Sequence, residues 1–231
     1  MAAAITTTMI DPAALRLWQL ISPTLPVGAY AYSAGLETAV ACGWVADEPG
    51  LERWVTGQAR HLLAGVDLPA LARLMRAWRE ADEAALDQWS AWLRAVRETA
   101  ELRAEDEHLG RALARLLVSL GEEDAAAWDA PGRVTWATAF ALAATRWEVA
   151  ERSAAAGYLW AWLENQVAAG VKLIPLGQSA GQRVLFAAAA EVPGVVEDAL
   201  TRDDDALGSS APGLAIASSQ HETQYTRLFR S

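Results

Sequence analysis

Cysteine and lysine are almost absent from this chain of 231 residues. Cys42 is the only thiol and Lys172 is the only lysine, so every other basic residue is an arginine. A single cysteine excludes an internal disulfide, which is usual for proteins that fold in a reducing compartment. We therefore expect a cytoplasmic protein.

Positive charge is also scarce, since the formal net charge is −10. Nucleic-acid surfaces and anionic lipids both attract basic segments, so the charge argues against nucleic acid and against a membrane as partners. No apolar run reaches the roughly 18 residues that a membrane-spanning helix needs. Residues 1–10 lack the basic start and apolar core of a signal peptide.

Helical patterns dominate what is present. Alanine is abundant, 53% of the residues are hydrophobic, and alanine and arginine favour helices. Asp11, Asp47 and Asp82 each precede apolar residues spaced three and four apart, which is the start signal of an amphipathic helix. Alternation typical of strands is almost absent. We predict an all-α fold: a single helical bundle of about ten helices with a flexible C-terminal tail.

Composition divides the chain into four segments. Residues 1–10 are expected to be disordered, and residues 11–202 to form the helical domain. Residues 203–214 combine acidic residues with glycine, serine and proline, as flexible linkers do. Residues 215–231 form the tail. Within the domain, residues 82–121 form one long helical pattern, which a polar stretch or Gly110 could divide.

One short pattern is typical of an enzyme. Residues 177–181 fit the G-x-S-x-G nucleophile elbow around Ser179, and residues 203–205 and His221 follow in the order of a catalytic triad. A serine hydrolase would need a parallel sheet around Ser179, whereas the neighbouring segments predict helices. We therefore prefer a packing role for these small residues and predict no catalytic residue and no cofactor.

The tail has the composition of an interface. Aromatic, apolar and arginine side chains follow the predicted linker, and exposed clusters of this kind are typical of binding hot spots. They are Tyr225, Arg227, Leu228, Phe229 and Arg230. The alternative is that the tail folds back onto its own core. The residues alone leave both interpretations open.

Four motifs resemble those of the UreF family. They are residues 25–37 (LPVGAYAYSAGLE), residues 101–103 with Gly110, residues 164–183, and residues 221–231 (HETQYTRLFRS). The resemblance runs from about residue 15 to residue 231 in the family's order. Two departures are Asp106, where the family commonly has serine, and residues 217–220, where a methionine is usual.

The resemblance implies an all-α homodimer that acts as a non-enzymatic scaffold. Its expected partners are a UreD- or UreH-type accessory protein, the GTPase UreG and apo-urease. That assembly supports nickel insertion into urease with GTP hydrolysis by UreG, which the scaffold is expected to regulate.

The resemblance also assigns roles to residues. The five tail residues named above are expected to contact the UreD-type partner, and a second group is expected on the assembly surface: Gly28, Tyr32, Ser33 and Glu37. The three histidines, His61, His108 and His221, show no metal-ligand spacing. His221 is a candidate for a transient nickel contact, because imidazole suits Ni²⁺, although we prefer an interface role for it.

Overall fold

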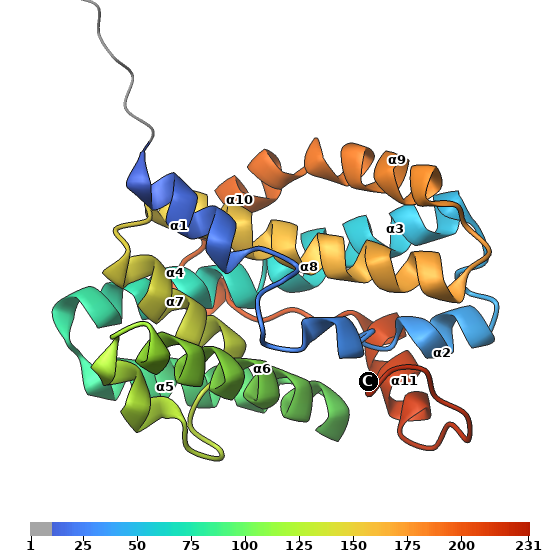
Figure 1. Ribbon diagram of the computed structural model, residues 1–231. Coiled ribbons are helices and arrows are strands. Elements are labelled where there is room, and N and C mark those ends of the chain that lie inside the picture. The colour runs from blue at the N-terminus through green and yellow to red at the C-terminus, as the bar shows by residue number, and fades with distance from the viewer. Residues whose placement is uncertain (1–10) are drawn as a thin grey trace, which may run out of the picture.

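The computed structural model describes residues 11–231 (Figure 1). Polar side chains cap the starts of several of its helices. Asp11, Asp47 and Asp82 accept hydrogen bonds from main-chain amides of α1 (Pro12–Leu20), α3 (Glu48–Gln58) and α5 (Glu83–Val96). Thr99 and Thr135 do the same for α6 (Ala100–Ser119) and α7 (Trp136–Arg146). Each cap satisfies an amide that has no partner within its helix.

The described part of the chain contains eleven α-helices and no strand. This confirms the predicted all-α fold, while the predicted disorder of residues 1–10 lies outside the described residues. The other helices are α2 (Leu36–Ala41), α4 (Asp67–Glu80), α8 (Glu151–Leu173), α9 (Gln178–Ala189), α10 (Val192–Thr201) and α11 (Pro212–His221). Shorter turns are η1 (Ala29–Ala31), the π-helical η2 (Ala59–Leu63), η3 (Glu123–Trp128) and η4 (Asp204–Ala206).

The longest helix, α8, spans 23 residues and runs through the middle of the molecule (Figure 1). Helices α1, α2, α3, α4, α9 and α10 all contact it. Two glycines allow α1 and α3 to approach closely: a Cβ atom at Gly157 would lie 2.7 Å from Leu17, and one at Gly170 would lie 2.5 Å from Leu51. Helices α5, α6 and α7 form a second layer: α5 and α7 pack against α4, and α6 packs against α7.

A cluster of buried charged side chains connects the helices around α8 with the second layer. The guanidinium of Arg97 binds the carboxylates of Asp67 at 2.6 Å and Asp106 at 3.1 Å. The hydroxyl of Tyr158 on α8 donates to Asp67, and Asp106 accepts a bond from the first amide of α7, that of Trp136. Burial raises the pKa of Asp106, and the charge of Arg97 opposes that rise. The cluster thus joins α4, α6, α7 and α8.

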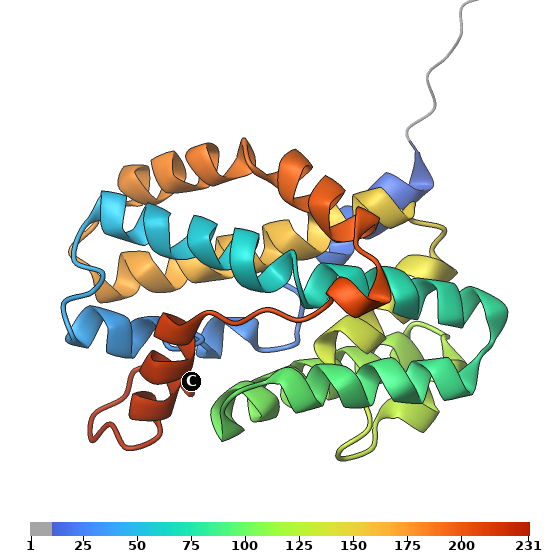
Figure 2. The ribbon, with the colours of Figure 1, turned by 180° about the vertical axis from the view of Figure 1, so that it is seen from behind.

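The predicted linker, residues 203–214, includes η4 and the first turn of α11 (Figure 2). Arg73 of α4 binds Asp204 at 2.6 Å and the carbonyl oxygen of Arg202. Farther along, the amide of Gly208 donates to the carbonyl of Gly65. These bonds hold the segment against the helical body and lead the chain from α10 to α11.

Candidate partner-binding site

The C-terminal tail folds back onto the protein's own helices. Helix α11 packs on α2, and the Ser218 hydroxyl is 2.7 Å from that of Thr99, the cap of α6. Gly35, at the start of α2, has a φ of +79°, and a Cβ atom there would lie 3.1 Å from the amide nitrogen of Ser218. A side chain at this position would therefore strain the backbone and push α11 away.

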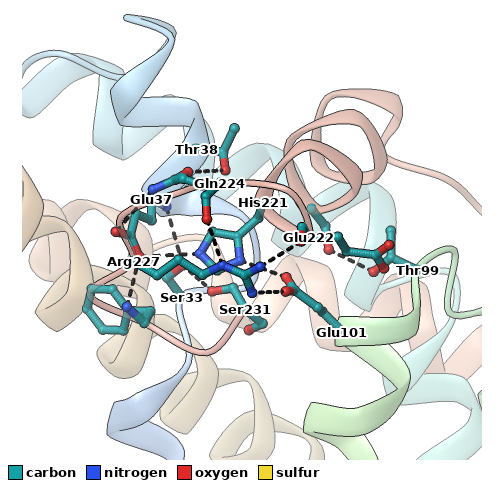
Figure 3. A network of polar contacts seen from close by, with 12 residues as sticks. Ser33, Glu37, Thr38, Thr99, Glu101, His221, Glu222, Gln224, Arg227 and Ser231 are labelled. Atoms are coloured by element: carbon teal, nitrogen blue, oxygen red, sulfur yellow. Dashed lines mark hydrogen bonds and ion pairs between the residues drawn. The ribbon is translucent and has the colours of Figure 1, made fainter.

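Glu37, in the first turn of α2, is the centre of the tail's hydrogen bonds (Figure 3). Its carboxylate accepts bonds from the amides of Leu228 at 2.7 Å and Phe229 at 2.8 Å, and from the side chain of Gln224 at 3.3 Å. Hydrogen bonds to a buried charge are stronger than those between neutral groups. The loop from 224 to 229 is consequently wrapped around one side chain.

His221, at the end of α11, is completely buried between two carboxylates (Figure 3). Its Nδ1 atom lies 2.7 Å from Glu101 of α6, and its Nε2 atom lies 3.3 Å from Glu37 of α2. Arg227 binds the other oxygen of Glu101 at 2.7 Å. The imidazole therefore connects three elements that are distant in sequence.

Ser231 is fully buried between the start of α2 and α6. The amide of Ser33 donates to its carbonyl at 3.0 Å, and its hydroxyl donates to Glu105 at 2.6 Å. Burial raises the pKa of Glu105 from 4.5 to about 7, although the bond from Ser231 acts to lower it. Glu105 is thus only partly ionised at neutral pH.

Aromatic, apolar and arginine side chains are exposed on and beside this anchored loop. Tyr225 is fully exposed and Leu228 is 66% exposed, while the amide of Arg230 binds the carbonyl of Ala31 beside the 71% exposed Tyr30. We call Tyr30, Tyr225, Leu228 and Arg230 the tail surface. Because its main chain is already held in place, a partner would not have to order it on binding.

The residues expected at the assembly divide into two groups. Tyr225, Arg227, Leu228 and Arg230 are exposed, whereas Tyr32, Ser33, Glu37 and Phe229 are buried and Gly28 is half-buried. The buried group holds the tail to the body: Phe229, for example, packs beneath Lys172, whose Nζ atom is 5.6 Å from the ring centre. The two interpretations of the tail are therefore compatible, because it folds back and still exposes part of its side chains.

Sequence reasoning missed Tyr30 and the anchoring partners Glu101 and Glu105. Tyr30 lies in the same motif as Tyr32, residues 25–37, and that motif could have indicated that Tyr30 belongs to the site. Glu101 begins the motif at residues 101–103 but was given no role, and Glu105 belongs to none of the four motifs. Each meets a tail residue 126 positions away, which no local pattern shows.

The residues that a serine hydrolase would use, Ser179, His221 and an aspartate of residues 203–205, do not form a catalytic triad. Ser179 is an exposed residue in the first turn of α9, with no strand before it in residues 11–231. Both ring nitrogens of His221 face Glu37 and Glu101, and Asp204 is bound to Arg73. The sequence order of these residues was therefore coincidental.

Residues 11–231 contain no cluster of three or more His, Cys, Asp or Glu side chains arranged to hold a metal ion. Within the same range, no helix combines the length and apolar character needed to cross a bilayer.

The fold and the site define a class: an all-helical protein whose C-terminal tail is anchored to its own body through acidic side chains of α2 and α6. The UreF family model matches residues 45–189, which is more than half of the chain. The chain belongs to the UreF family.

Relatives share most of their length with this chain. A urease accessory protein UreF from Alkalilimnicola ehrlichii is 55% identical over 94% of this chain and 95% of its own length. Proteins of the same name from Teredinibacter turnerae (50% identical, 94% and 98% covered) and Pseudomonas putida (49%, 96% and 99%) are also similar.

Proposed function

We propose that this protein is a non-enzymatic, cytoplasmic scaffold of urease maturation. It assembles with a UreD- or UreH-type protein and the GTPase UreG on apo-urease and supports nickel insertion. The observation that supports this most directly is identity of up to 55% with urease accessory proteins over almost the whole chain.

The tail surface is the proposed contact with the UreD-type protein. Exposed aromatic and arginine side chains are typical of binding hot spots, and here they project from a loop whose main chain is bound to Glu37 and Ala31. In this proposal Tyr225 and Leu228 enter the interface directly. Glu37, Ser33 and Phe229 act indirectly, by holding the loop in shape.

UreG and a second copy of this chain are proposed to bind elsewhere on the helical body. The chain has no G-x-x-x-x-G-K-[ST] sequence, so GTP hydrolysis is assigned to UreG, and this protein would influence it through binding alone.

Co-purification with the cognate UreD-type protein tests the tail contact. The double variant Tyr225→Ala, Leu228→Ala should lose capture while its helical content stays unchanged. Leu15→Ala is a matched control, because Leu15 is 48% exposed on α1. Capture that survives the double variant would move the interface to the helical body. Failure of the unsubstituted chain to capture any urease maturation protein would refute the proposed function.

A further inference from the structure

A cavity of about 120 Å³ lies where the helices around α8 meet the second layer. Residues of α3, α4, α6, α7, α8 and α11 line it. Its volume is well above the roughly 10–15 Å³ that a single water molecule needs, so it has room for a small molecule. The lining includes Glu98, which is exposed, and Trp162 and Asn165, which are half-buried, so the cavity reaches the surface of the protein.

Gln58, the last residue of α3, contributes a polar side chain to this cavity and is only 4% exposed. Within residues 11–231, neither its Oε1 atom nor its Nε2 atom has a hydrogen-bond partner. Buried polar side chains nearly always have one, and leaving such a group unpaired is costly. The π-helical turn η2 begins at the next residue, and π-helical turns are frequent at functional sites. Gln58 therefore has the environment of a ligand-binding residue.

The buried charged side chains of the wall, in contrast, already bind one another or the tail. Arg97 binds Asp67 at 2.6 Å and Asp106 at 3.1 Å. Glu105 accepts a 2.6 Å hydrogen bond from the hydroxyl of the last residue in the chain. Selection of a ligand is thus left to the two unpaired atoms of Gln58.

We propose that the cavity binds a small neutral molecule that has a carbonyl oxygen beside an N–H group, as a primary amide has, and that Gln58 recognises it. The side chain of Gln58 accepts through its oxygen and donates through its NH2 group, and these two lie side by side. Only a ligand with a donor and an acceptor in the matching arrangement pairs with both. The inference concerns this chain alone and does not depend on the proposed partners.

Charged ligands of the same shape match Gln58 less well. A carboxylate accepts from the NH2 group and leaves the Gln58 oxygen unpaired, whereas an amidinium donates to the oxygen and leaves the NH2 group unpaired. Each group left unpaired in a buried site weakens binding by about tenfold or more. The buried side chains of Leu62 and Leu109 belong to the same wall, and they favour a ligand whose remaining part is apolar.

Three probes of nearly the same shape test this on the full chain: acetamide, acetate and acetamidinium. Nuclear magnetic resonance should show saturable shifts of the Gln58 and Trp162 side-chain signals with acetamide, at the millimolar affinity expected for so few atoms. Acetate and acetamidinium should bind at least about tenfold more weakly. Equal binding of all three probes, or no saturable shift with acetamide, would overturn the proposal.

Two substitutions locate the site. Gln58→Met keeps the length of the side chain and removes its amide, so acetamide binding should fall by at least about tenfold while the fold is retained. Gln88→Met is the matched control, because Gln88 is exposed on α5, and it should bind acetamide as the unsubstituted chain does. If Gln58→Met does not fold, the comparison of the three probes still decides. Undiminished acetamide binding in folded Gln58→Met would refute the role of this side chain.

Discussion

The main-chain amide of Phe229 donates a 2.8 Å hydrogen bond to the carboxylate of Glu37, a residue 192 positions earlier in the chain. The adjacent amide of Leu228 binds the other oxygen of the same carboxylate at 2.7 Å. Two consecutive residues thus share one anchor, yet Phe229 is buried and Leu228 is largely exposed. This arrangement separates what holds the tail from what the tail presents.

Replacing Glu37 with glutamine should release the tail without unfolding the bundle. The side-chain amide would keep one acceptor oxygen and would turn its NH2 group toward one of the two main-chain amides. Hydrogen bonds to charged groups contribute about 2 kcal/mol, which corresponds to about a thirtyfold loss of exchange protection at residues 228 and 229. Glu52→Gln, at an exposed site on α3, should leave protection unchanged. Equal protection in both variants would show that Glu37 is not the anchor.

Alanine at Phe229 should weaken docking of the tail, whereas alanine at its neighbour Leu228 should weaken binding of the partner. Phe229→Ala removes a buried ring and should weaken docking of the tail by about 3 kcal/mol, as large-to-small changes in cores do. Leu228→Ala, at a 66% exposed position, should change stability by less than about 0.5 kcal/mol but should weaken capture of the UreD-type protein. Exchange protection measures docking, and co-purification measures capture. The separation of roles fails if Leu228→Ala loosens the tail as much as Phe229→Ala.

The sequence was most informative where a structural rule is local. Asp11, Asp47 and Asp82 each begin a helix as predicted, because capping involves only the next few residues. Gly121 ends the α6 segment with a φ of +95°, as its pattern indicated. The long pattern over residues 82–121 is divided at residues 97–99, in the polar stretch, and not at Gly110.

Such local rules do not predict contacts between residues that are far apart in the sequence. Nothing near Glu37 in the sequence indicates that its carboxylate binds residues 224, 228 and 229, and the bond between Ser231 and Glu105 spans 126 positions. Resemblance to the UreF family pointed to Ser33, Glu37 and the tail as functional. It did not show that Ser33 and Glu37 are buried and support the tail from beneath.

Glu105 should make stability depend on pH. Its pKa is raised from 4.5 to about 7, chiefly by burial, so between these values the folded protein binds a proton that the unfolded chain releases. Stability from this group is fully present below about pH 4.5 and is lost as the pH rises to about 7, by about 3 kcal/mol at most.

The comparison of Glu105→Gln with the unsubstituted chain isolates that effect from other titrating groups. Urea unfolding at several pH values should show the variant gaining stability relative to the unsubstituted chain as the pH rises from about 4.5 to about 7 and no further gain above it. Glu52→Gln should show no such trend. A stability difference that does not vary with pH would mean that folding does not raise the pKa of Glu105.

Gly110 and Gly57 both lie inside helices, and alanine should have opposite effects at the two positions. A Cβ atom at Gly110 would lie 2.6 Å from the main-chain carbonyl of Thr135, so α6 and the start of α7 would have to separate. Overpacking of this kind costs about 1–3 kcal/mol. At Gly57 no atom lies within 4 Å of the added Cβ, and alanine in an open helix position adds about 0.5–1 kcal/mol of stability.

Thermal unfolding of the two variants measures these opposite changes in stability. Gly110→Ala should melt below the unsubstituted chain and Gly57→Ala slightly above it, because both changes add the same methyl group and differ only in what that group meets. A Gly110→Ala variant as stable as Gly57→Ala would mean that the contact between α6 and Thr135 can relax at no cost. In that case the position of α7, whose first amide binds Asp106, would not depend on the absence of a side chain at residue 110.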